Sequence, residues 1–128
     1  MSVGGPGEGG VTLDEFFGGH EESRRIFETV RQAVATIGPA DVRVTKSQVV
    51  FRRRTGFACV WMPDMYLGKG DVPLVLTVGL RRRDASPRWK QIVEPAPGRF
   101  THHLELRSGA DIDAEVRGWL QEAWEGAA

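Results

Sequence analysis

The sequence predicts a two-layer α+β fold, in which N-terminal and C-terminal helices pack on one face of a five-stranded antiparallel meander sheet. Apolar residues with helical spacing lie near both ends of the chain, whereas the middle holds five short runs rich in β-branched and aromatic residues. Turn residues join these runs by short links, and short links favour antiparallel neighbours. Helices segregated from such a sheet cover one of its faces.

Three helices are predicted from capping residues and apolar spacing. Thr12 and Glu15 have the spacing of a capping box, so a short helix should begin after Thr12. A second helix is expected over residues 21–37, before the helix-ending pair Gly38-Pro39, and a third should begin at Asp111 as its N-cap. Their apolar stripes comprise Ile26, Phe27, Val30, Val34 and Ile37 in the second helix, and Ile112, Val116, Trp119, Leu120 and Ala123 in the third.

Five strands are expected between the helices. Residues 55–56 make a tight hairpin turn, residues 67–71 form a longer loop, and residues 95–98 form the last turn. The expected strands span residues 46–53, 57–62, 72–80, 89–94 and 100–107. If Phe57 and Leu74 face the helices, the other face carries Ala58, Val60, Met62, Val75, Thr77 and Gly79.

An open apolar face of this kind is unusual for a monomer. Either a partner covers it, or the sheet curls around a ligand. Trp124 lies just off the apolar stripe of the last helix and is a further candidate for contact with a partner chain. A homodimer is therefore expected.

Length and cysteine usage indicate one soluble domain. Residues 1–10 form a glycine-rich flexible tail, and residues 11–128 form a single α+β domain large enough to need no disulfide or metal. Cys59 is the only cysteine; it alternates with Phe57 and Trp61 as a small buried hydrophobe, which favours a reducing, cytoplasmic location. No apolar run approaches the ~20 residues that span a bilayer, so no membrane partner is expected.

Charge is distributed unevenly along the chain. The formal net charge is zero, which argues against a protein that binds nucleic acid over its whole surface. Residues 40–100, however, carry 12 Lys and Arg against 5 Asp and Glu, a net charge of +7, and the two flanks together carry −7. The middle of the chain is basic and its ends are acidic.

Two arginine triplets, residues 52–54 and 81–83, close the first and third expected strands. In an up-and-down meander these strands end on the same side, so six guanidinium groups should gather on one rim. Arg88 and Arg107 are expected there too, with the positive N-terminal end of the last helix. Guanidinium groups bind phosphate and carboxylate in a bidentate manner. The alternative is that solvent and nearby aspartates neutralise the rim; those are Asp84, Asp111 and Asp113.

His102 and His103 are neighbours on one strand and point to opposite faces, so they cannot share a metal ion. His102 lies on the face of Phe100, Leu104 and Leu106 and should be a hydrogen-bonded core residue. His103 lies with Glu105 on the other face, and a histidine beside a carboxylate can act as a general base. Polar groups from the first strand could join them there, namely Lys46 and Gln48.

A family resemblance that covers nearly everything from Thr12 onward depends on the order of several short segments. They are Val44-Thr45-Lys46-Ser47-Gln48, Phe51-Arg52-Arg53, Phe57-Ala58, Gly98-Arg99-Phe100-Thr101-His102-His103 and Ala123-Trp124-Glu125. In this order the chain resembles a family of small bacterial α+β domains of unknown function, which occur as stand-alone proteins or as C-terminal modules. The resemblance implies a fold and no particular chemistry.

These features favour a cytoplasmic binding module that presents an arginine-rich rim to a polyanion or a phosphate-bearing ligand. The expected rim residues are Arg52, Arg53, Arg54, Arg81, Arg82, Arg83 and Arg88. The alternative is a ligand pocket or small enzyme on the open sheet face that uses His103 and Glu105. No catalytic motif is present, so an enzyme is the less favoured reading, and no catalytic residue, metal or cofactor is predicted.

Overall fold

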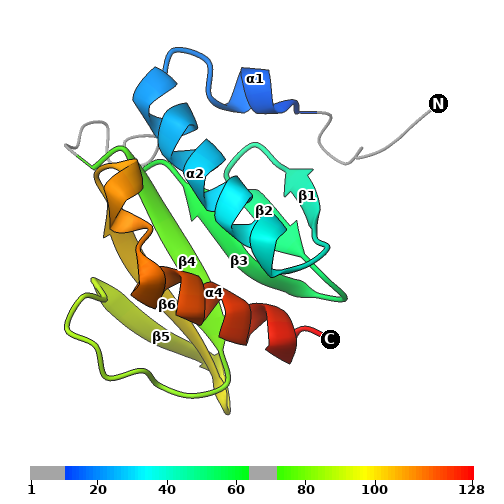
Figure 1. Ribbon diagram of the computed structural model, residues 1–128, viewed down its shortest axis with the longest axis vertical. Coiled ribbons are helices and arrows are strands. Elements are labelled where there is room, and N and C mark those ends of the chain that lie inside the picture. The colour runs from blue at the N-terminus through cyan, green and yellow to red at the C-terminus, as the bar shows by residue number, and fades with distance from the viewer. Residues whose placement is uncertain (1–10, 64–71) are drawn as a thin grey trace.

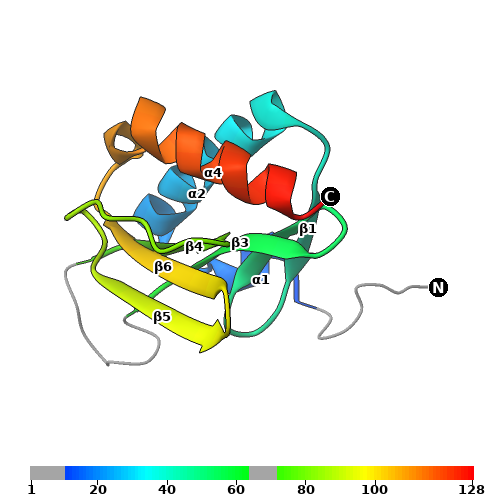
Figure 2. The ribbon, with the colours of Figure 1, turned by 90° about the horizontal axis from the view of Figure 1, so that it is seen from below.

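The computed structural model describes residues 11–63 and 72–128, in which two long helices cover one face of a six-stranded antiparallel sheet (Figures 1 and 2). The predicted α+β class and antiparallel sheet are confirmed, but the sheet has six strands rather than five. The segments expected as a tail and a loop, residues 1–10 and 67–71, lie outside the described residues. Within the described ranges, no helix has the length and apolar character that crossing a membrane requires.

The helices begin at capping side chains. The expected capping box opens α1 (Leu13–Phe16), because Thr12 Oγ1 accepts from the Glu15 amide at 3.0 Å and Glu15 Oε1 accepts from the Thr12 amide at 2.9 Å. Helix α2 spans Glu21–Ile37. A 3-10 turn, η2 (Gly109–Asp111), precedes α4 (Ala114–Gly126). Asp113, not the expected Asp111, is the N-cap of α4: its Oδ1 accepts from the Val116 amide at 3.1 Å.

The strand order is β1-β2-β3-β4-β6-β5, so the sheet is not the simple meander that was expected. The strands are β1 (Asp41–Val44), β2 (Val49–Arg52), β3 (Gly56–Trp61), β4 (Leu74–Leu80), β5 (Gln91–Ala96) and β6 (Arg99–Leu106). After β4 the chain passes to the sheet edge as β5, and β6 returns between them. Pro95 has no amide hydrogen to donate and suits β5 to an edge, because a central strand needs ladder bonds on both sides.

The extra strand is β1, which precedes the first expected strand and consists of residues for which no strand was expected. Residues 46–48, expected as strand, lie in the turn that joins β1 to β2. Thr45 holds this turn: its amide donates to the Gln48 carbonyl at 2.9 Å, and its Oγ1 accepts from the Gln48 amide at 3.1 Å. Val44 and Val49 then face each other as the closing pair of the hairpin.

The expected alternation of faces along β3 is wrong, because the strand contains a β-bulge. Phe51 pairs with Ala58 and Arg52 with Gly56, so Phe57 is an extra residue in the ladder. Phe57 and Ala58 are consequently both buried, and the alternation beyond them shifts by one residue. Val60 and Met62, expected on the open face, are fully buried beneath the helices. The open face carries Cys59 and Trp61 instead, beside Thr77, which was expected there.

Candidate functional site

The two arginine triplets lie at the same end of the sheet, where two of its inner strands terminate. Strands β2 and β4 both run antiparallel to β3 and therefore point the same way, ending at Arg52 and Leu80. The first triplet, residues 52–54, begins at the end of β2 and the second, residues 81–83, follows the end of β4; we call this end of the sheet the arginine rim. The side chains of Arg53, Arg54, Arg81, Arg82 and Arg83 are exposed, and that of Arg52 is half-buried.

The end of α4 that meets the rim is its C-terminus, not the expected N-terminus. Arg53 Nη1 donates to the Trp124 carbonyl at 3.1 Å, and Arg81 Nη2 donates to the Gly126 carbonyl at 2.7 Å. The last carbonyls of a helix lack intrahelical partners and carry partial negative charge, so guanidinium groups stabilise them. Part of the rim charge is thus used to cap α4.

Arg82 is neutralised by carboxylates. Its Nε and Nη2 donate to both oxygens of Glu122 at 2.7 and 2.8 Å, and its Nη1 donates to Asp84 Oδ1 at 2.8 Å. The hydrogen bonds from Arg82 are the main cause that lowers the pKa of Glu122. The alternative of a neutralised rim therefore holds at Arg82, with Glu122 and Asp84 as the partners.

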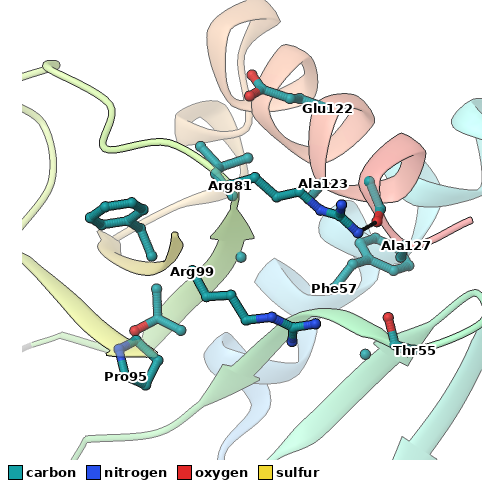
Figure 3. A pocket seen from close by; sticks show the side chains of 14 residues that line it. Thr55, Phe57, Arg81, Pro95, Arg99, Glu122, Ala123 and Ala127 are labelled. Carbon is teal, nitrogen blue, oxygen red and sulfur yellow. Dashed lines mark hydrogen bonds between the residues drawn. The ribbon is translucent and has the colours of Figure 1, made fainter. Parts of the chain in front are cut away.

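A pocket of about 340 Å³ opens at the rim, between the ends of the strands and the last turn of α4. Arg99, the first residue of β6, lies here because Phe100 pairs with Leu80 at the end of β4. Figure 3 shows the side chains of Arg81 and Arg99 extending in the same direction across the pocket, toward Phe57 and Thr55. The remaining walls are mostly apolar: Leu80, Pro95, Phe100, Ala123 and Ala127.

Arg99 was not among the expected rim residues; it lay between the expected turn, residues 95–98, and the last expected strand, residues 100–107. Its guanidinium has no hydrogen-bond or ion-pair partner among the described residues. If the last expected strand, residues 100–107, had been paired with the third, residues 72–80, as well as with the fourth, residues 89–94, Arg99 would have been placed beside the second triplet. The sequence contains no direct signal for that pairing.

Arg88 and Arg107, which were expected on the rim, lie elsewhere. Arg88 Nη1 bonds Asp113 at 3.0 Å and Glu115 at 2.8 Å, at the start of α4. Arg107 follows the opposite end of β6, beside Leu106, which pairs with the first residue of β4. These corrections follow from the strand order, since β6 runs away from the rim and α4 runs toward it.

His102 is a fully buried core residue, as expected. Its Nε2 accepts a hydrogen bond from the Asp84 amide at 3.0 Å, and its ring packs against Trp89 with the centroids 4.8 Å apart. Burial is the main cause that lowers the pKa of His102 below its ordinary value. The ring therefore links β6 to the segment that follows the second arginine triplet.

His103 belongs to a hydrogen-bonded cluster on the open face. Its Nδ1 lies 2.7 Å from Thr77 Oγ1, which also accepts from Trp61 Nε1 at 3.1 Å. Burial, and secondly the nearby His102, lower the pKa of His103. Since Nδ1 is occupied by Thr77, only Nε2 remains for a ligand. Glu105, the expected partner of His103, instead lies 3.5 Å from Arg107.

Cys59 lies in the same cluster and is half-buried. Its Sγ donates to Gln48 Oε1 at 3.3 Å, and burial raises the pKa of the thiol to about 11. A thiol with so high a pKa is almost fully protonated at neutral pH and is a poor nucleophile. Lys46 is exposed in the β1–β2 turn and does not join the cluster.

Comparison with known proteins identifies the family. The chain belongs to the family described as domain of unknown function DUF5655, whose model matches residues 13–127. No curated protein and no solved structure matches the chain. The family agrees with the small-domain resemblance of the sequence and assigns no activity to the rim or to the open face.

Proposed function

We propose that the domain is a binding module whose site is the pocket at the arginine rim, and that its ligand joins an anionic group to a small apolar part. The observation that carries the proposal is that Arg81, which follows β4, and Arg99, which begins β6, both line one mostly apolar recess of about 340 Å³.

The anionic group is the part of the ligand that the arginines would bind. Arg99 has no competing partner among the described residues. Arg81 uses Nη2 for the Gly126 carbonyl, and its other N–H groups can donate to a ligand. A guanidinium offers five donors in a planar fork that matches phosphate or carboxylate. Glu122, which also lines the pocket, is bonded to Arg82 and so repels an anion less than a solitary carboxylate would.

The apolar part follows from the walls. Phe57, Leu80 and Phe100 contribute apolar surface to the lining, and Ala123 and Ala127 keep the α4 side small. Pockets for small ligands are typically apolar with a few polar groups that fix orientation. Inorganic phosphate alone would leave this apolar surface uncovered, so a ligand that covers it should bind more tightly.

The proposed setting is the bacterial cytoplasm. The only cysteine of the chain is half-buried and bonded to Gln48, and a chain without a possible intramolecular disulfide suits a reducing compartment.

Titrations with small probes test the proposal. Phenyl phosphate supplies both parts of the expected ligand, inorganic phosphate only the anion, and benzyl alcohol only the apolar group. We expect phenyl phosphate to bind most tightly and to shift the amide NMR signals of Gly79 and Gly126, which line the pocket. Binding of all three probes with equal affinity, or no binding of phenyl phosphate, would contradict the proposal.

Matched arginine variants test the site itself. Arg99→Gln removes a charge inside the pocket, whereas Arg83→Gln removes one from the exposed rim outside it. We expect the first to weaken phenyl phosphate binding about tenfold or more, because a charge-assisted hydrogen bond is lost, and the second to leave binding unchanged at moderate salt. Equal loss in the two variants, together with heparin binding that falls steeply with salt, would instead indicate a diffuse polyanion surface.

A further inference from the structure

Among the strands of the described residues, β1 forms one edge of the sheet and pairs only with β2 (Figure 1). Edge strands present unpaired backbone groups, and monomeric proteins commonly protect them with proline, bulges or charges. The other edge strand, β5, has such protection: it contains Pro95, and its pairing with β6 is irregular between Val93 and Ala96. Strand β1 has four regularly paired residues and no proline; its two charged residues, Asp41 and Arg43, have opposite signs, so they oppose pairing with a second copy only in registers that place like charges opposite each other.

The sequence of β1 is complementary to itself in an antiparallel pair. If two copies of β1 pair about a two-fold axis at Val42, Asp41 of one copy lies opposite Arg43 of the other, and this happens twice. The pairing also places Val42 opposite Val42, and Ala40 opposite Val44. Opposite charges and apolar residues directly across an antiparallel pair stabilise it.

The two faces of β1 agree with this arrangement. Val42 and Val44 pair with Phe51 and Val49 and thus lie on the helix-covered side, whereas Asp41 lies on the other side. The Asp41 and Arg43 side chains have no ion-pair or hydrogen-bond partner among the described residues. Their charges therefore remain available to a second copy of the chain.

An apolar recess of about 400 Å³ lies beside the same edge on the helix-covered side. Its lining is mostly apolar, with one charged residue, Arg31 of α2; the apolar residues are Val34, Ala35, Pro39, Ala40, Val42 and Phe51. Val42 is 37% exposed and is one of only two large hydrophobic residues that are exposed in the described part of the chain. A second copy paired at β1 would set its own Val42 and Ala40 against this recess and extend the apolar layer across the edge.

We propose that two copies of the chain form a two-fold symmetric dimer by antiparallel pairing of their β1 strands, centred on Val42. This interface differs from the dimer through the open sheet face that the sequence suggested. That expectation depended on Val60 and Met62 being uncovered, and both are buried inside one chain. An isologous interface of this kind is the usual solution for a homodimer, because the same patch serves both subunits.

Charge-exchange variants test the dimer by sedimentation velocity over a range of protein concentrations. Asp41→Arg places Arg opposite Arg, and Arg43→Asp places Asp opposite Asp, so each single variant should raise the dimer dissociation constant about tenfold or more. The double variant Asp41→Arg/Arg43→Asp restores opposite charges in the reverse order and should dimerise again. A mixture of the two single variants should form a heterodimer that neither forms alone.

Val93→Lys on β5 is the matched control, because Val93 is the other exposed large hydrophobic residue and is 39% exposed on the opposite edge strand. It should leave the dimer intact. Circular dichroism melts of every variant establish that the monomers remain folded. The proposal is overturned if the parent chain stays monomeric at all concentrations. It is also overturned if the dimer dissociation constant is the same in the parent chain and in the single variants at positions 41 and 43.

Discussion

Trp124 of α4 lies so close to Gly38, at the end of α2, that a Cβ atom on Gly38 would be 2.3 Å from Cζ2 of the indole. The indole Nε1 also donates to the Pro39 carbonyl at 2.9 Å, and the guanidinium of Arg53 stacks over the ring, 3.5 Å from its centroid. Trp124 therefore joins α4 to the α2–β1 link and to the end of β2. The sequence suggested a contact with a partner chain, whereas this side chain packs within its own domain.

Gly38→Ala is expected to destabilise the fold by about 1–3 kcal/mol through overpacking against Trp124. The φ angle of Gly38 is 170°, which any residue adopts, so the cost comes from the overlap and not from the backbone. Urea unfolding measures the change. The cost should nearly vanish in a Trp124→Leu background, and an equal cost in both backgrounds would show that the overlap is not its cause.

Gly118→Ala is the matched control for glycine replacement and has the opposite expected sign. Gly118 lies within α4, and apart from its chain neighbours and the adjacent backbone of the helix itself nothing in the described structure is within 4 Å of a Cβ placed on it. Alanine should therefore stabilise the domain by about 0.5–1 kcal/mol, because glycine loses more backbone entropy in a helix. A loss of stability in the same urea assay would mean that this face of α4 is not open in solution.

Neighbouring arginines of the first triplet should differ in their contribution to stability. Arg53→Ala removes both the stacking on Trp124 and a bond to the last turn of α4, at an expected cost of about 1 kcal/mol. Arg54 is exposed, and its side chain has no bonded partner among the described residues, so Arg54→Ala should be nearly neutral. Thermal melts compare the two variants; equal melting temperatures would contradict the capping role of Arg53.

The sequence predicted those parts of the fold whose signals are local. The stripe from Ile26 to Ile37 and the capping box at Thr12 gave helices close to their observed bounds. The placement of both arginine triplets at one end of the sheet could be predicted because alternate strands of an antiparallel sheet run the same way. The burial of His102 followed from strand alternation, because no bulge interrupts β6 where it pairs with β4.

What the sequence did not reveal depends on contacts between distant segments. At the bulge, Arg52 pairs with Gly56 and Phe57 is the extra residue. This shift exchanges the faces of Val60 and Cys59 relative to the expected alternation. The return of β6 beside β4 brought Arg99 to the rim and took Arg107 away from it. Strand β1 has four residues, too few for an alternation signal, and its turn at Thr45 lacks the usual glycine or proline.

Cys59 should react slowly with thiol reagents in the folded protein. Burial raises the pKa of its thiol to about 11, so only about one molecule in a thousand carries the thiolate at pH 8. Alkylation by iodoacetamide at pH 8 should therefore be slow in buffer and become fast in concentrated urea, where the pKa returns to its ordinary range. Equal rates in the two conditions would mean that the thiolate is not suppressed by the fold.

The histidines should make the domain less stable in mild acid. Burial lowers the pKa of both His102 and His103 in the native state, so the unfolded chain binds protons that the native chain does not. Their contribution is fully present above the unfolded pKa of about 6.5 and is lost as the pH falls below it. The free energy of unfolding should fall by at most about 1.4 kcal/mol per pH unit for each histidine.

Single histidine variants separate these two contributions. His102→Ala removes the acceptor of the Asp84 amide and the ring packed on Trp89, so it should cost about 1–3 kcal/mol at pH 8. His103→Ala loses its bond to Thr77 and an edge-on ring contact with Trp61 on the half-buried face, and should cost less. Each variant should also flatten the dependence of the free energy of unfolding on pH between pH 5 and 7. Urea titrations at several pH values measure both quantities, and a larger loss for His103→Ala at pH 8 would reverse the assignment of the core histidine.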